Sequence, residues 1–305
     1  MKPITQENDR LGFIGVGYMG RPIARRLLEA GFKLTAYDRD PNKADELVRY
    51  GGTVAQSVSE LSSSCNVVLS CLPSDQAVLD IYRGAGGVFA NAHNGSVVID
   101  LSTVYPETSQ ELSRLGTEHG VEVLDVTMSG STPVAEKGLL TLFGGGNKER
   151  FDSAESIFRV IAQKYFYLGP SGSGATMKLV VNALLGIGMQ AIAEAVALGE
   201  KAGLDRNRLL EVLSQTAVVA PAHLGKLQRA RNRDYSPQFP IRLMNKDFGL
   251  IFDLANAVGA RMPAAGAAFE INARQSEEGP EQDFSAVILQ MEKPAHLGSN
   301  GDGRT

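Results

Sequence analysis

The chain has few of the residues that build disulfide frameworks or metal centres. Among its 305 residues are two cysteines and four histidines. Cys65 and Cys71 lie around one apolar run, NVVLSCLP, and a disulfide fits poorly within an extended strand. We therefore expect two reduced thiols in the core of the protein. The histidines show no metal-ligand spacing, so we expect no metal site.

The sequence also lacks a strong excess of charge of either sign. Its formal net charge is −4, and no basic run or basic stripe stands out. A nucleic-acid-binding surface needs clustered lysine and arginine, so the charge pattern argues against that class of protein. A length of 305 residues is enough for two domains that each bury a core.

No hydrophobic run is long enough to predict a membrane span. The most apolar stretch, residues 179–193, carries no formal charge but contains Asn182 and Gln190. A span needs about 20 consecutive apolar residues, so we interpret this stretch as a buried helix. The first ten residues are polar and do not form a signal peptide pattern. We accordingly expect a cytoplasmic protein without a membrane anchor.

A glycine motif near the start of the chain predicts a dinucleotide site. Residues 10–38 read RLGFIGVGYMGRPIARRLLEAGFKLTAYD, an order that predicts strand, tight turn, helix and strand. In such a motif the first glycine makes the turn, the second lets the backbone approach a pyrophosphate, and the third lets helix and strand pack closely. We expect cofactor contacts from Gly15, Val16, Gly17, Tyr18, Met19 and Gly20.

Asp38 argues against the alternative of a glycine-rich turn that only packs and binds nothing. It lies 18 residues after Gly20, where an acidic side chain accepts the hydroxyl groups of the adenine ribose. Its carboxylate would repel a 2′-phosphate, which favours NAD. Arg39 follows directly and could stack on adenine or bind that phosphate. NADP therefore stays open beside NAD.

The order of strand and helix patterns predicts two domains. From residue 11 to about 169 the patterns alternate, which is typical of a doubly wound, mostly parallel sheet. After GPSGSG at 169–174 only helical patterns follow. We expect an α/β protein with a Rossmann-type domain over residues 10–170 and an all-α substrate and oligomerisation domain over residues 171–292, entered through a long interdomain helix. Residues 1–9 and 293–305 are expected to be disordered tails.

The expected elements follow from local patterns. Further strands are expected at 34–37, 67–72, 97–100, 121–125, 139–143 and 165–168. Helices are expected at 106–119, 151–161, 175–202, 206–215, 223–230, 243–258, 263–273 and 284–290.

A small polar turn, Ser129-Gly130-Ser131, lies just past one expected strand. Open α/β sheets bind ligands at this edge. Small residues there expose backbone N–H groups and hydroxyl groups that can hold a carboxylate. The alternative is a polar turn that binds nothing.

Lys178 and Asn182 lie four residues apart and share one face of the long helix. Their neighbours in sequence are apolar. Apolar surroundings lower the pKa of a lysine and suit it to proton transfer near neutral pH. Asn182 could hold the lysine or a substrate hydroxyl. The alternative is a lysine whose ammonium group extends to solvent.

Four blocks together resemble the β-hydroxyacid dehydrogenases, the family of 3-hydroxyisobutyrate dehydrogenase and tartronate semialdehyde (2-hydroxy-3-oxopropionate) reductase. The blocks are GFIGVGYMG at 12–20, DVTMSGSTPVAEKG at 125–138, GSGATMKLVVN at 172–182 and NKDFGLI at 245–251. They stand in the family's order, and the resemblance extends from about residue 11 to residue 291. It implies reversible hydride transfer between a nicotinamide and a short 3-hydroxy acid or its semialdehyde. The apolar helical half suggests a homodimer or homotetramer.

The resemblance also implies roles for single residues. Lys178 matches the family's catalytic lysine, and Asn182 matches its partner on the same helix. Ser129 and Gly130 match the site of the substrate carboxylate, and we include Ser131 beside them. Further cofactor contacts are implied for Leu72, Pro73, Thr103 and Lys246.

Two departures from the family pattern affect the choice of substrate more than the chemistry. Ser131 stands where the family usually has the second glycine of SGG, and Leu139 stands where it has the threonine of GTL.

Other interpretations stay open. An imine reductase shares the expected architecture, but members of that group generally lack a lysine at position 178. A non-catalytic dinucleotide-binding or chromatin-associated relative would keep the glycines and lose the proton donor. Lys178 therefore argues against both. A 6-phosphogluconate dehydrogenase is disfavoured because those chains are considerably longer.

Overall fold

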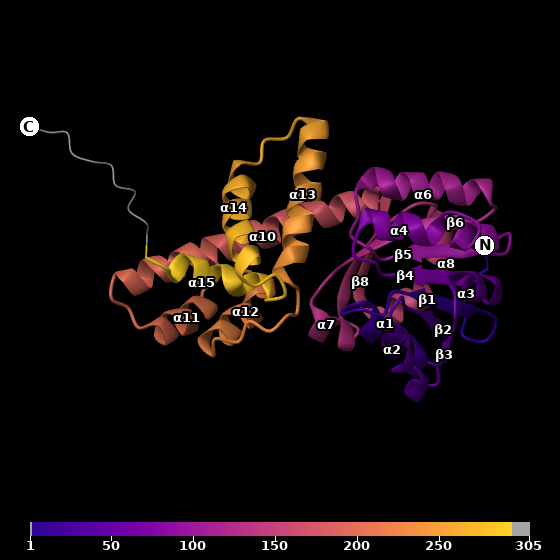
Figure 1. Cartoon of the computed structure of the whole chain (residues 1–305), viewed down its shortest axis with the longest axis horizontal. Coiled ribbons are helices and arrows are strands. Elements are labelled where there is room, and N and C mark those ends of the chain that lie inside the picture. Colours follow the sequence, from indigo (N-terminus) through magenta and orange to yellow (C-terminus); the bar gives the residue numbers. More distant parts are fainter. Residues whose placement is uncertain (1, 295–305) are drawn as a thin grey trace, which may run out of the picture. The chain divides into compact units, whose positions relative to one another are not determined.

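The computed structural model describes residues 2–294, and the contacts within the chain divide it into two units (Figure 1). The first unit takes in the residues up to 182 together with residues 250–258. The second unit takes in residues 183–249 and the described residues from 259 onward. The first turns of the long helix α10 (Ser173–Lys201) therefore belong to the first unit.

An eight-stranded sheet forms the centre of the first unit, in the order β3-β2-β1-β4-β5-β6-β7-β8. All neighbouring strands are parallel except β6 and β7, which are antiparallel. The expected α/β fold with a doubly wound, mostly parallel sheet is thus confirmed. The strands are β1 (Arg10–Ile14), β2 (Lys33–Tyr37), β3 (Thr53–Val54), β4 (Val67–Ser70), β5 (Val97–Asp100), β6 (Glu122–Ser129), β7 (Leu140–Gly145) and β8 (Ala162–Gly169).

Helices cover both faces of the sheet, so the central strands are buried on both sides. On one face Phe13 and Leu69 lie in a core with side chains of α1 and α9. On the other face Ile14 and Val68 lie in a core with side chains of α3, α4, α5 and α6. The helices of this unit before α10 are α1 (Gly20–Glu29), α2 (Pro41–Asp45), α3 (Val58–Ser64), α4 (Asp75–Tyr82), α5 (Val88–Asn91), α6 (Pro106–Glu118), α7 (Thr132–Glu136), α8 (Lys148–Ser153) and α9 (Glu155–Ile161).

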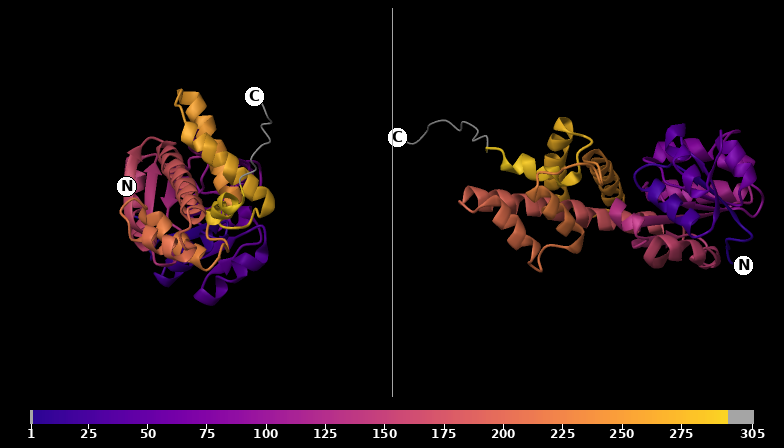
Figure 2. Two further views of the ribbon diagram at one scale, coloured as in Figure 1. Left: turned by 90° about the vertical axis from the view of Figure 1, so that its left-hand side faces the viewer. Right: turned by 90° about the horizontal axis from the view of Figure 1, so that it is seen from below.

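The described residues of the second unit form helices and the loops between them, with one isolated antiparallel bridge between Pro240 and Asp283. This unit contains the larger part of α10, which is one uninterrupted helix of 29 residues (Figure 2). By length and composition α10 could cross a membrane, a test that the core helix of a globular protein also passes, and half of its most apolar window is buried in the protein. The other helices that contribute to this unit are α11 (Arg206–Ser214), α12 (Pro221–Arg231), α13 (Ile241–Val258), α14 (Pro263–Glu278) and α15 (Val287–Glu292), with a short 3₁₀ turn at Phe284–Ala286.

Two expectations about local structure are wrong. Residues 2–9 are attached to the sheet unit, because Ile4 is buried, its N–H donates to Ser153 O at 2.8 Å, and its carbonyl accepts from Ser156 Oγ at 2.6 Å. The helix expected at 151–161 is two helices, α8 and α9, which meet at Ala154. Of the second expected tail, residues 295–305 lie outside the described residues.

Candidate functional site

The glycine loop connects β1 to α1, and its three glycines have different surroundings. Gly15 has φ +93°, and a Cβ there would lie 2.4 Å from Cys71 O. A Cβ on Gly20 would lie 1.9 Å from Gly15 O. A Cβ on Gly17 meets no atom within 4 Å. The protein's own backbone therefore requires the first and third glycines, whereas Gly17 borders open space, as a residue that faces a phosphate does.

The start of α1 offers the other half of a phosphate site. Met19 is its N-cap residue and supplies no side-chain hydrogen bond to the first turn. In the first turn the Arg21 N–H already donates to Gly17 O at 3.1 Å and Pro22 has no N–H, so it is chiefly the positive end of the helix dipole that can attract a phosphate here. Tyr18, beside it, is exposed. These residues fit the pyrophosphate of a dinucleotide.

Asp38, directly after β2, is bonded to the glycine loop. Its Oδ2 accepts the Val16 N–H at 2.7 Å, and its Oδ1 accepts the Asp40 N–H at 2.9 Å. Each carboxylate oxygen has a second lone pair, so Asp38 can fix the loop and still accept a ribose hydroxyl. The side chains of Arg39 and Lys43 are exposed nearby, and Lys43 Nζ lies 4.0 Å from Asp38 Oδ1. An acidic side chain and two basic side chains thus lie at the adenosine end of the expected site.

The loops after β4 and β5 carry the predicted cofactor residues Leu72-Pro73 and Thr103. The two loops are bonded to each other, because the Leu72 N–H donates to Ser102 Oγ at 2.9 Å. Asp75 Oδ1 accepts the Tyr105 N–H at 2.7 Å. These bonds hold the loops together at the carboxyl edge of the sheet, where open α/β sheets bind ligands.

Asp100, the last residue of β5, is a site residue that the sequence analysis missed. It is buried, and its Oδ1 accepts the hydroxyl groups of Ser70 and Ser102, each at 2.6 Å. Burial raises the pKa of Asp100, and the two serine hydroxyl groups oppose that shift. Since Ser102 also holds Leu72, Asp100 supports the loop predicted to lie over the cofactor. The only sequence signal was an acidic residue that ends an apolar strand, VVID.

The predicted substrate turn joins β6 to α7. Ser129 is the last residue of β6, and Ser131 is the N-cap residue of α7 without a side-chain cap bond. Gly130 has φ +141°, and a Cβ there would lie 2.7 Å from Leu140 Cδ2. Thr132 Oγ1 contacts Met19 Sδ at 3.9 Å. The structure therefore brings this turn to the glycine loop.

Lys178 and Asn182 lie on the first turns of α10, within the sheet unit. Lys178 is half-buried, and Asn182 is 1% exposed. The start of α10 is bonded to β6, because Thr127 Oγ1 donates to Gly174 O at 2.7 Å. The helix that carries Lys178 and the turn that contains Ser129 are thus attached to one strand. Asn182 was paired with Lys178 only because the two residues lie four positions apart. Its burial favours a role inside the protein.

Lys246 lies on the part of α13 that belongs to the second unit. Its Nζ lies 2.7 Å from Asp247 Oδ1, and Asp247 is 2% exposed. The carboxylate of this ion pair is therefore buried, while the lysine is partly exposed. The cofactor role of Lys246 stays a prediction.

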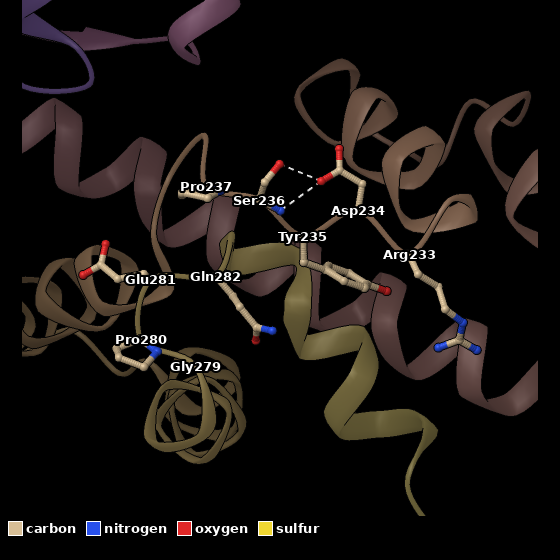
Figure 3. A pocket seen from close by; sticks show the side chains of 9 residues that line it. All are labelled: Arg233, Asp234, Tyr235, Ser236, Pro237, Gly279, Pro280, Glu281 and Gln282. Carbon is tan, nitrogen blue, oxygen red and sulfur yellow. Dashed lines mark hydrogen bonds between the residues drawn. The ribbon is translucent and has the colours of Figure 1, made fainter.

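The helical unit contains an open pocket of about 560 Å³, lined by residues 233–237 and 279–282 (Figure 3). Its charged side chains are already paired: Arg233 with Glu292, Asp234 with Arg229, and Glu281 with Arg242. None of the predicted site residues lines it. We therefore place the candidate active site in the sheet unit. Within residues 2–294 no group of three or more His, Cys, Asp or Glu side chains could hold a metal ion.

Comparison with known proteins identifies the family of the chain. A family model described as the NAD binding domain of 6-phosphogluconate dehydrogenase matches residues 10–169. A second, described as NAD-binding of NADP-dependent 3-hydroxyisobutyrate dehydrogenase, matches residues 172–291. The chain belongs to the β-hydroxyacid dehydrogenase family.

Individual relatives cover almost all of this β-hydroxyacid dehydrogenase. Glyoxylate/succinic semialdehyde reductase 1 of Arabidopsis thaliana is 36% identical over 279 residues, 91% of this chain and 96% of that protein. A 3-hydroxyisobutyrate dehydrogenase of Pseudomonas aeruginosa is 34% identical over 287 residues, 91% of this chain and 96% of that protein. The solved structure of Mycobacterium tuberculosis 3-hydroxyisobutyrate dehydrogenase with L-serine has a TM-score of 0.82 at 30% identity, covering 93% of this chain and 99% of that one.

These findings confirm the predicted family, the fold and a nicotinamide dinucleotide cofactor, NAD or NADP. As a β-hydroxyacid dehydrogenase the protein is an oxidoreductase that acts on CH–OH groups. The roles of the single site residues stay predictions.

Proposed function

We propose that this β-hydroxyacid dehydrogenase interconverts a short 3-hydroxy acid and its semialdehyde, with Lys178 as general acid and base. The attachment of both α10 and the Ser129–Ser131 turn to β6 carries the proposal. The helix that carries Lys178 and the turn to which we assign the substrate carboxylate are thus both joined to one strand, and this supports the proposal. The printed names of two relatives, a 3-hydroxyisobutyrate dehydrogenase and an L-serine dehydrogenase, support this substrate class.

Each part of the site has one task in this mechanism. The bound cofactor supplies or accepts the hydride at its nicotinamide ring. The glycine loop and the start of α1 bind the pyrophosphate, and Asp38 accepts ribose hydroxyl groups. The Ser129–Ser131 turn binds the substrate carboxylate and so fixes the orientation of the reacting carbon.

Proton transfer is assigned to Lys178. In reduction its ammonium Nζ donates a proton to the substrate oxygen, and in oxidation its neutral Nζ accepts the hydroxyl proton. Asn182, one turn further on α10, holds the lysine or the substrate hydroxyl group.

A substrate panel tests this proposal. We expect turnover of at least one of tartronate semialdehyde, 3-hydroxyisobutyrate, glycerate, threonate and serine, measured by nicotinamide absorbance in the appropriate direction. Glyoxylate and succinic semialdehyde, which are reduced to a 2-hydroxy and a 4-hydroxy acid, are included for contrast, and turnover of these two alone would contradict the 3-hydroxy class. Because Asp38 repels a 2′-phosphate, kcat/KM is expected to be higher with NAD(H) than with NADP(H). A strong NADPH preference would show that Arg39 and Lys43 dominate. Faster reduction of a cyclic imine, or cofactor binding without any turnover, would contradict the proposal.

We also propose that the protein is a homodimer or homotetramer. Leu184 and Leu198, on the part of α10 in the helical unit, are 70% and 72% exposed, and Ala191 and Ala195 between them are exposed too. Such an apolar stripe along one helix face is typical of a contact with a second helix. Light scattering should give a mass above 32.6 kDa, and Leu184→Lys with Leu198→Lys should reduce the oligomer. A monomeric wild type would overturn this assignment.

A further inference from the structure

Asp125 is a buried carboxylate for which the mechanism above has no use. It lies in β6 and is 2% exposed. Its Oδ1 accepts the Gly172 N–H and its Oδ2 accepts the Ala175 N–H, both at 3.0 Å. Both oxygens thus bind backbone N–H groups at the start of α10, which a helix leaves without intrahelical partners.

The same face of β6 makes a second contact with α10. Side chains alternate along a strand, so Asp125, Thr127 and Ser129 point to one face. Thr127 Oγ1 donates to Gly174 O at 2.7 Å. A Cβ on Gly174 would lie 2.4 Å from Asp125 O, so the helix start lies directly on the strand backbone. The start of α10 has no room to shift toward the sheet.

These contacts relate the two halves of the candidate site. Ser129 lies two residues beyond Thr127, about 6.6 Å along the strand. Lys178 lies four residues beyond Gly174, about 6 Å along the helix. A single strand therefore sets the position of the carboxylate-binding turn and of the lysine. A small displacement of the start of α10 would change the distance from Lys178 to the reacting oxygen.

We propose that Asp125 is a positioning residue, whose carboxylate fixes the first turn of α10 on β6 and thereby aligns Lys178 with the substrate held at Ser129 and Gly130. The assignment rests on the proposed function of Lys178. Because both oxygens of Asp125 already bind backbone N–H groups, we assign it no contact with substrate or cofactor.

The ionisation of Asp125 adds a pH dependence to this role. Burial raises the pKa of Asp125 to about 6, while the backbone N–H bonds from Gly172 and Ala175 oppose the shift. Protonation turns one oxygen into a donor, which competes with an N–H donor of α10. The charged and titratable side chains on the elements packed around β6 at this face are Asp100 on β5, Lys178 on α10, and Glu107, Glu111, Arg114 and Glu118 on α6; β7 has none.

The raised pKa of Asp125 has different consequences for activity and for stability when the pH falls. In the unfolded chain an aspartate titrates near pH 4, about two pH units below the folded pKa of Asp125. The folded state therefore binds the proton more readily between about pH 4 and 6. The contribution of Asp125 to stability is largest below pH 4 and is lost as the pH rises through about 6. Acidification through pH 6 should thus lower kcat without any loss of stability through Asp125.

Asp125→Asn tests the inference, with Asp152→Asn, an exposed aspartate of the same unit, as the matched control. The amide keeps one acceptor and turns an NH₂ toward the second N–H donor. We expect kcat of Asp125→Asn to fall by about 10²-fold, as for a displacement of about 1 Å, with the KM of the cofactor unchanged. The wild-type decline of kcat near pH 6 should be absent from this variant and present in Asp152→Asn.

Two further measurements test whether Asp125 fixes the start of α10. Hydrogen exchange by mass spectrometry should be faster for residues 172–178 in Asp125→Asn, and unchanged for α1. Thr127→Val, which removes the bond to Gly174 but keeps Asp125, should lower kcat less and retain the decline near pH 6. Unchanged exchange, or wild-type kcat with the same acid decline in Asp125→Asn, would overturn the inference. If the wild type turns over no substrate of the panel, the proposed function fails, and exchange still decides whether Asp125 fixes α10.

Discussion

Lys178→Ala is expected to lower kcat by about 10²–10⁴-fold, the usual contribution of general acid–base catalysis, while the cofactor affinity is unchanged. The variant removes the group that carries the proton and leaves the glycine loop, Asp38 and the loops after β4 and β5 intact. Steady-state turnover of the best panel substrate gives kcat, and a titration with the reduced cofactor, followed by its fluorescence, gives Kd.

Two companion variants identify the cause of that loss. Lys178→Arg keeps a positive charge, but a guanidinium does not release its proton in proteins, so turnover should stay low. Lys164→Ala removes an exposed lysine from β8 in the same unit and should keep wild-type turnover. Near-normal turnover of Lys178→Ala would show that another group transfers the proton. High turnover of Lys178→Arg would show that the charge of residue 178 matters and its proton does not.

The sheet was predictable where a local pattern determines the structure. The apolar runs of β2, β4 and β5 are bounded by turn residues, and each lies where it was expected. The strand β3 has two residues, Thr53 and Val54, which are too few to show a period. Apolar runs do not encode direction either, so the antiparallel pairing of β6 and β7 was not predicted. Only residues 130–139 connect these strands, too few for the crossover that a parallel pair needs.

The separate parts of the site could be predicted from the sequence, but the contacts that bring them together could not. The glycine loop, the Ser129 turn and Lys178 each have a local signature. The bonds that join them connect distant residues: Asp125 binds Gly172 and Ala175, and Thr127 binds Gly174. The expected strand at 121–125 ended at Asp125, four residues before the end of β6 at Ser129. Pairing with β7 extends β6 to Ser129 and buries Asp125 and Thr127, which a single-strand pattern cannot reveal.

Gly17→Val is expected to leave the fold intact and to abolish measurable cofactor binding. The backbone of Gly17 is not in the left-handed region, and a Cβ there meets no protein atom within 4 Å. The valine side chain would therefore occupy the open space that the pyrophosphate needs. Thermal unfolding without cofactor should match the wild type, and addition of NADH should raise Tm only in the wild type, because only bound ligand stabilises the folded state.

Gly20→Val and Gly86→Val are the matched controls, since neither glycine has a positive φ. A Cβ on Gly20 would lie 1.9 Å from Gly15 O, so this variant should lose stability by overpacking, about 1–3 kcal/mol or more, even without cofactor. Gly86 has no atom within 4 Å of its Cβ and lies outside the glycine loop, so its variant should keep both stability and binding. If Gly17→Val binds NADH normally, the open space beside Gly17 is not the pyrophosphate site. If it unfolds without cofactor, the loop requires glycine at 17 for its own packing, and the division of roles among the three glycines fails.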